Sequence, residues 1–266
     1  MQKYLNVLLF LMLSNFGIPI VSTIAADGTK ASLTLKRSAH PTSMKLIEPG
    51  VFDVPLVLSK SLEPRRSEFR QNVIDAQKKL RAFAKSNAWE QLTDKPLIKR
   101  VEVYDTKDGW DNRLRQFYPK EAPKVIPKTF SAAIEKDIFF AVSPDVYLKN
   151  YPDGKDEPRA FEKLITHELA HRLHVRICKG DESKMGPIWF WEGFAVYAAD
   201  QLNYNRPNLS EREIWNIVDA KERGSYRKYN VVFRHFLKKT DSLSDYVSRA
   251  GKPDFMQWLK KESKEG

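Results

Sequence analysis

The stretch FEKLITHELAHRLH, residues 161–174, places two histidines four positions apart around a glutamate. Its residues follow a helical pattern that ends at the Lys-Gly-Asp of residues 179–181. At about 100° per residue, His167 and His171 lie roughly 40° apart around the helix axis and one turn apart along it. The sequence therefore predicts a helix that runs to about Arg176 and presents both imidazoles on one face.

Two imidazoles in this arrangement can bind one tetrahedral zinc ion. Glu168 stands next to the first histidine, a position from which it cannot easily join the same face as a ligand. It can instead reach a water on the metal and act as a general base. The same pattern also arises by chance in helices whose histidines face the surface, so the motif alone leaves both interpretations open.

A catalytic zinc site needs a third protein ligand and keeps a fourth position for water. His174 lies close to His167 around the helix but about two turns along the axis, which favours a supporting or packing role. Glu192 lies within IWFWEGFAVYAAD, residues 188–200, where a carboxylate among aromatic residues is unfavourable unless it is paired or metal-bound. The alternative is that Glu192 adds charge to the first turn of its helix. We expect Glu192 to be the third ligand.

The motif HELAH, followed by the glutamate of WEGFA 21 positions after His171 (192 minus 171), resembles the gluzincin metallopeptidases, the group of thermolysin and the zinc aminopeptidases. The similarity covers about residues 130–240. It implies one Zn²⁺ ion held by His167, His171 and Glu192, with Glu168 as the catalytic base. It also implies hydrolysis of peptide bonds by a zinc-activated water.

A second stretch, YRKYNVVFRHF at residues 226–236, is similar in spacing to the helix that carries a catalytic tyrosine in several gluzincins. The similarity places Tyr226 on that tyrosine, whose hydroxyl binds the oxyanion that forms on the scissile carbonyl. Tyr229, at a position where glycine is usual, is the second candidate. Upstream, AAIEK resembles, through Glu135 and one alanine, the segment that holds a substrate's free amine in the aminopeptidases.

The thermolysin-like aspartate that orients a ligand histidine, four residues after the ligand glutamate, is absent from this chain. Val196 occupies that position, and Asp200 stands one turn further along. The group that orients the histidines is therefore left open.

The hydropathy pattern changes character near residue 150. Before this point, residues 67–89 follow a helical pattern, and residues 97–105 and 137–145 follow strand patterns. After it the pattern is helical, with further helices expected near 187–202, 210–222, 226–239 and 253–262. We predict an α+β fold with a small mixed α/β N-terminal lobe (27–150) and a helical C-terminal lobe (151–266) that carries the zinc site. The resemblance implies that the second lobe is zincin-like and that residues 137–142 form an edge strand over the active site.

The first 26 residues have the composition of a signal peptide: Lys3, an apolar core from Leu5 to Leu13, and small residues at Ala25 and Ala26. This pattern predicts a secreted or periplasmic protein without stable membrane insertion after cleavage. The alternative is an uncleaved N-terminal membrane anchor. The single cysteine, Cys178, excludes a disulfide within the chain.

The chain carries 45 Lys and Arg residues against 34 Asp and Glu, a formal net charge of +11. The two signs are interleaved and no nucleic-acid-binding motif is present, which favours a basic surface without a nucleic-acid partner. We expect a secreted zinc-dependent metallopeptidase acting on peptides or proteins. The alternatives are a catalytically inactive zincin-fold binding module, on the cell surface or in the periplasm, and a basic polymer-binding protein.

Overall fold

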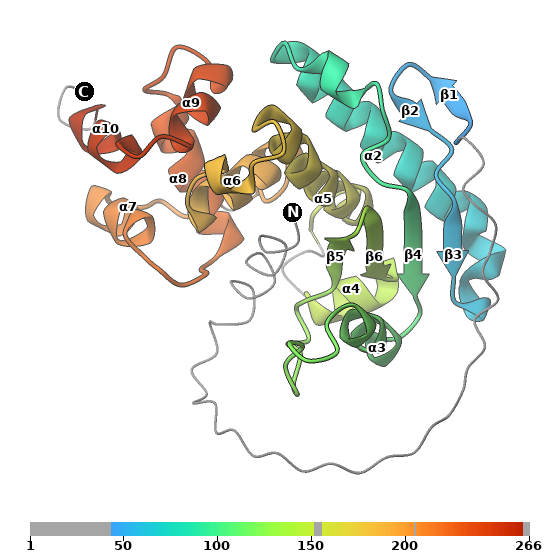
Figure 1. The fold of residues 1–266 in the computed structure, drawn as a ribbon. Coiled ribbons are helices and arrows are strands. Elements are labelled where there is room, and N and C mark those ends of the chain that lie inside the picture. The colour runs from blue at the N-terminus through green and yellow to red at the C-terminus, as the bar shows by residue number, and fades with distance from the viewer. Residues whose placement is uncertain (1–43, 152–155, 205, 263–266) are drawn as a thin grey trace.

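The computed structural model describes residues 44–151, 156–204 and 206–262, and this part of the chain is a mixed α/β protein (Figure 1). The predicted signal peptide, residues 1–26, lies outside the described residues. Within the described ranges, no helix combines the length and the apolar character needed to cross a membrane.

A four-stranded sheet has the order β3 (Leu56–Leu58), β4 (Arg100–Tyr104), β6 (Ile138–Val142) and β5 (Ala132–Glu135). Strands β3, β4 and β6 are parallel, whereas β5 pairs antiparallel with β6. A separate antiparallel ribbon joins β1 (Leu46–Glu48) and β2 (Val51–Phe52). Strand β5 is thus the edge of the larger sheet on its antiparallel side.

Helices make up most of the rest of the described chain, and those after residue 159 follow one another without an intervening strand. The α-helices are α2 (Arg66–Ser86), α3 (Lys107–Phe117), α4 (Pro144–Asn150), α5 (Ala160–Ile177), α6 (Ile188–Ala198), α7 (Glu211–Val218), α8 (Tyr226–Leu237), α9 (Leu243–Ala250) and α10 (Phe255–Glu262).

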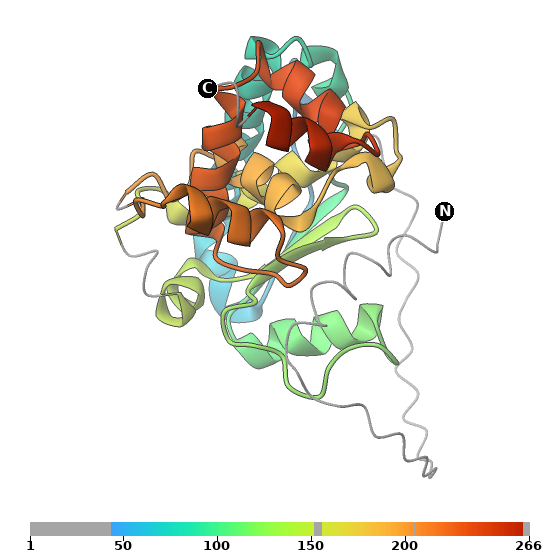
Figure 2. The ribbon, with the colours of Figure 1, turned by 90° about the vertical axis from the view of Figure 1, so that its left-hand side faces the viewer.

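The sheet is covered on both faces because successive side chains of a strand point in opposite directions. Phe139 and Ala141 belong to the larger core, which includes residues of α2 and α5. Phe140 and Val142 belong to a smaller core with Trp110 of α3, whose indole N–H donates to the carbonyl of Phe140 at 3.0 Å. Figure 2 shows α3 on one side of the sheet and the later helices α8–α10 on the other.

The position of β6 corrects one prediction. Residues 137–142 were expected to form the edge strand over the site, but β6 lies between β4 and β5. The physical reason is its apolar sequence, IFFAV, which has large side chains on both faces and is buried on both. The edge next to the site is β5.

Helices α6 and α8 approach each other closely at Gly193. A Cβ atom built at Gly193 would lie 2.7 Å from the Cβ of Phe233 and 3.1 Å from the carbonyl oxygen of Tyr229. Only a hydrogen fits in this space, so the absence of a side chain lets α8 pack against α6. The glycine that follows Glu192 thereby brings the start of α8, with Tyr226, close to that glutamate.

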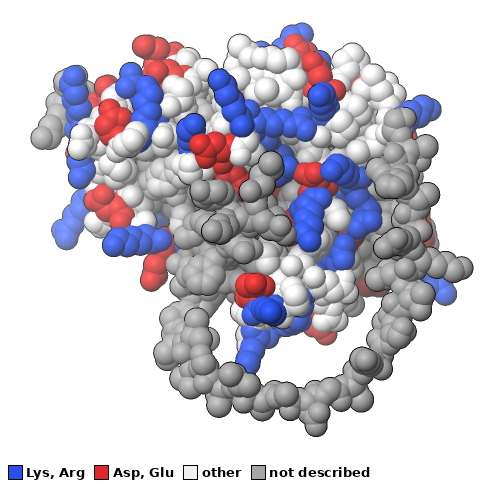
Figure 3. All heavy atoms as spheres, in the orientation of Figure 1, with Lys and Arg blue, Asp and Glu red and all other residues white. Residues whose placement is uncertain are grey.

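The surface carries charges of both signs. On the face drawn in Figure 3, Lys and Arg side chains are interspersed with Asp and Glu. Several form exposed ion pairs, such as Arg65 with Glu68 at 2.7 Å and Lys78 with Glu48 at 3.2 Å. Pairs of this kind contribute little to the free energy of folding. The charged residues therefore determine the character of the surface and do little to stabilise the fold.

Candidate metal centre

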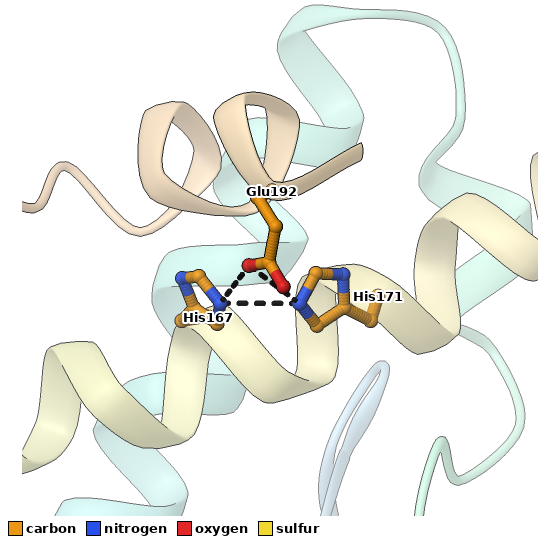
Figure 4. A group of neighbouring side chains, drawn as sticks. All are labelled: His167, His171 and Glu192. Atoms are coloured by element: carbon orange, nitrogen blue, oxygen red, sulfur yellow. Dashed lines mark hydrogen bonds and ion pairs between the residues drawn. The ribbon is translucent and has the colours of Figure 1, made fainter. Parts of the chain in front are cut away.

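Two histidines of α5 and one glutamate of α6 converge on a common point (Figure 4). Nε2 of His167 lies 3.1 Å from Nε2 of His171 and 3.1 Å from Oε2 of Glu192. Nε2 of His171 lies 3.5 Å from the same carboxylate oxygen. All three side chains are buried, so the sequence-predicted ligand set is brought together.

The spacing of these atoms fits a small tetrahedral ion. With metal–ligand bonds of about 2.0–2.2 Å, tetrahedral geometry separates two ligand atoms by roughly 3.3–3.6 Å. The observed separations of 3.1 and 3.5 Å come close to these values. Two imidazole nitrogens that both point a lone pair at each other would repel, and a cation between them removes the repulsion. The buried group of His167, His171 and Glu192 could therefore hold a metal ion.

Burial keeps both imidazoles neutral, the form that binds metals. Loss of hydration lowers the pKa of His167, and it lowers the pKa of His171 to about 3. On the outer side of the site, Nδ1 of His167 lies 2.9 Å from Oε1 of Gln201. Nδ1 of His171 is buried and has no hydrogen-bond partner among the described residues.

The second oxygen of Glu192 has partners of its own. Arg223 forms an ion pair with Oε1, and the hydroxyl of Tyr226 lies 3.4 Å from the same atom. The guanidinium of Arg223 also lies over the rings of Trp191 and Tyr226, at 5.2 and 5.4 Å. Arg223 thus compensates the charge of a carboxylate that is almost wholly buried, which leaves Oε2 directed at the two imidazoles.

Glu168, the predicted base, lines the same cleft as the three candidate ligands. Its carboxylate forms no hydrogen bond or ion pair with another residue in the part of the chain that the structure describes. The cleft has a volume of about 110 Å³. Its other walls are mostly aromatic, aliphatic or neutral: Thr129, Phe130, Ser131, Ala132, Tyr147, Tyr151, Leu164, Gln201, Leu202 and Tyr226.

The two candidate tyrosines have different positions. Tyr226 lies in the cleft, with its ring centroid 5.6 Å from that of His167. Burial raises the pKa of Tyr226, which keeps its hydroxyl protonated and able to donate. Tyr229 is packed in the core and its hydroxyl accepts from the backbone N–H of Gly224. The structure therefore brings Tyr226 to the site and keeps Tyr229 out of it.

The remaining candidates lie apart from the three ligand atoms. His174 is fully buried between Phe190 and Phe194, with ring centroids 6.0 and 4.5 Å away, and neither of its nitrogens has a hydrogen-bond partner in the described part of the chain. Its role is packing, one of the two roles predicted. Asp200 is exposed and lies 3.7 Å from Lys163, so it does not orient a ligand.

Glu135 is on the edge strand β5 but does not line the cleft. Its carboxylate is buried, and loss of hydration raises its pKa to about 7. The aminopeptidase-like role of this residue therefore stays a prediction.

Gln201 and Arg223 make polar contacts to candidate ligands and were not singled out by the sequence. Both lie in irregular segments, where hydropathy periodicity gives no signal. The one available indication for Gln201 was its place next to Asp200, the residue already considered as an orienting group.

Comparisons of the chain with models of known families, with curated proteins and with solved structures give no match. The resemblance to the gluzincins therefore rests on the motif residues themselves. In the structure His167, His171 and Glu192 form a buried group that could hold a metal ion.

Proposed function

We propose that this protein is a zinc-dependent metallopeptidase whose metal ligands are His167, His171 and Glu192. The observation that carries the proposal is that this buried group and the carboxylate of Glu168, which has no partner among the described residues, line one open cleft. Two imidazoles and one carboxylate form a ligand set typical of catalytic zinc. A structural zinc site would instead close the coordination sphere with a fourth protein ligand.

Zinc at this position would polarise a carbonyl group and make a water molecule more acidic. Glu168 then takes the proton of the attacking water and passes it to the leaving amine, the work of a general base and acid. Tyr226, held protonated by burial, donates a hydrogen bond to the oxyanion that forms on the substrate carbonyl. Gln201 contacts His167 and Arg223 contacts Glu192, so both act on the proposed ligands.

We also propose how a peptide substrate enters the cleft. Strand β5 pairs with β6 on one side, and within the described sheet no strand pairs with its other side. The residues just before it, Thr129 to Ser131, form one wall of the cleft. A peptide substrate can add to this edge by backbone hydrogen bonds and so pass Glu168. We include in the proposal that the helices from α5 onward form a zincin-like unit and that the protein acts after export.

The test compares wild type with Glu168→Gln for zinc content and for cleavage of a mixed peptide library. We expect Glu168→Gln to retain one zinc ion and to lose about 10²–10⁴-fold in kcat/KM, because the ligands stay while the base is lost. Glu211→Gln, an exposed change of the same type on α7, is the matched control and should cleave like wild type.

Two results would contradict the proposal. Wild type that takes up no zinc would remove the metal centre altogether. Wild type that binds zinc but cleaves no peptide, with Glu168→Gln indistinguishable from it, would favour the inactive zincin-fold binding module.

A further inference from the structure

We infer that Gln201 is the positioning residue that fixes the imidazole of His167 for metal binding. The inference rests on the proposed metal centre and adds a residue to it. Oε1 of Gln201 lies 2.9 Å from Nδ1 of His167, on the side of the ring away from Glu192. His167 can present a lone pair from Nε2 only if its proton is on Nδ1. An acceptor at Nδ1 selects that tautomer.

The same contact fixes the orientation of the amide. The N–H of Nδ1 needs an acceptor, and only the oxygen of the Gln201 side chain can accept. Gln201 is 8% exposed, so water has little access to replace it. Nδ1 of His171, by contrast, has no partner in the described part of the chain. Among the described residues, Gln201 is therefore the group that orients a ligand imidazole of this site by a hydrogen bond.

The backbone around Gln201 is held in an unusual conformation. Asp200 and Leu202, on either side of it, have φ values of 55° and 56°. This left-handed region is unfavourable for residues other than glycine, and more so for leucine than for aspartate. Such a conformation persists where the surrounding structure holds it. The turn that carries Gln201 is thus fixed by its contacts and not by the local preference of its residues.

Those contacts come from two directions. From α8, the buried side chain of Asn230 donates to the carbonyl oxygens of Gln201 and Leu202 at 3.1 and 3.3 Å. On the other side, Nζ of Lys163 donates to the carbonyl of Asp200 at 2.7 Å, and Glu157 accepts from the N–H of Leu202 at 2.8 Å. Helix α8 therefore positions the turn with Asn230 and also brings Tyr226 to the cleft.

The test measures zinc affinity by competition with a chromophoric chelator for wild type and three variants. Gln201→Met keeps the size of the side chain without the amide acceptor and should weaken zinc binding about 10–100-fold, the usual effect of losing such a partner. Gln201→Glu keeps an acceptor at the same place. Its zinc affinity should be within about threefold of wild type or higher. Asp200→Asn, next in the chain and tolerant of the left-handed conformation, is the matched control and should bind like wild type.

A second measurement does not depend on activity. Long-range ¹H–¹⁵N correlation spectra of the zinc-loaded wild type should show the His167 proton on Nδ1, and this proton should exchange with water faster in zinc-loaded Gln201→Met, where its acceptor is lost. A proton on Nε2 would overturn the inference, as would Gln201→Met binding zinc as tightly as wild type. If wild type binds no zinc, the metal centre and this inference fall together, whereas zinc binding that is insensitive to Gln201 removes the inference alone.

Discussion

The interface between α5 and α6 has two ends, each with histidine from α5. At the metal-centre end, His167 and His171 face Glu192. At the aromatic end, His174 lies between Phe190 and Phe194. The same residue type on one helix is thus a candidate ligand at one end and a packing residue at the other.

The difference shows that the opposing residue on α6 decides what a buried histidine can do. All three imidazoles have a pKa lowered by burial, and that of His174 is about 3. Burial alone therefore does not distinguish a ligand from a packing residue. The distinguishing features are a carboxylate opposite the ring, present at one end and replaced by phenyl rings at the other, and an opening to solvent through the cleft.

The largest effect that separates the two ends is on metal affinity. His171→Ala should weaken zinc binding by about 10³-fold or more, because one of the three proposed protein ligands is lost and zinc sites in proteins typically have apparent binding free energies of the order of 10 kcal/mol. His174→Leu, a change of similar size at the aromatic end, should leave the affinity within about threefold of wild type. Chelator competition at fixed pH measures both. Equal losses in the two variants would mean that the two ends do not differ in function.

A second substitution tests whether the metal-centre end depends on α8. Gly193→Ala places a methyl group 2.7 Å from the Cβ of Phe233, which should lower the free energy of unfolding by about 1–3 kcal/mol through overpacking. The shift of α8 should move Tyr226 away from Glu192 and reduce kcat more than zinc affinity. Urea unfolding and steady-state kinetics on the same preparation provide the two numbers.

The matched control for this substitution is Ala195→Gly on the same helix. It also loses stability, by about 1–2 kcal/mol, but through backbone entropy and the loss of one buried methyl group, without a clash. Kinetics unchanged by Gly193→Ala despite the loss of stability would show that the placement of Tyr226 does not depend on the close approach of α8.

The grouping of His167, His171 and Glu192 could be predicted from sequence because its geometry is largely local. The spacing of His167 and His171 is a property of any α-helix, and Glu192 stood out as a carboxylate in an aromatic stretch. Gln201 and Arg223 could not be found in this way. Their positions depend on turns that are fixed by tertiary contacts, such as those of Asn230 with the carbonyls of residues 201 and 202.

The fold was predictable where periodicity is long and strong. Helix α2 and the helices α5, α6, α7, α8 and α10 were expected close to their observed positions, as were strands β4 and β6. Helices α3, α4 and α9 were not expected, because they are short and a helical period is hard to recognise over so few residues. Helices α3 and α9 form because Thr106 and Ser242 cap their first turns and because Trp110 and Tyr246 are buried against the rest of the protein.

The last expected effect is the pH dependence of stability at the aromatic end. The pKa of His174 is lowered to about 3 in the folded protein, against about 6.5 in an unfolded chain. Between these values the unfolded state binds the additional proton, so this histidine lowers stability as the pH falls below about 6.5 and has no further effect below about 3. The expected slope is about 1.4 kcal/mol per pH unit for one such group.

Comparison of wild type with His174→Leu isolates this slope, because the carboxylates and the other histidines titrate in both proteins. The difference in the free energy of unfolding, measured by urea denaturation with a chelator present, should grow in favour of His174→Leu by roughly 1.4 kcal/mol for each unit between about pH 6 and pH 4. Parallel curves would show that His174 takes up its proton in the folded protein as easily as in the unfolded chain. The aromatic end would then be accessible to water, and the difference between the two ends of the α5–α6 interface would lie in the carboxylate of Glu192 alone.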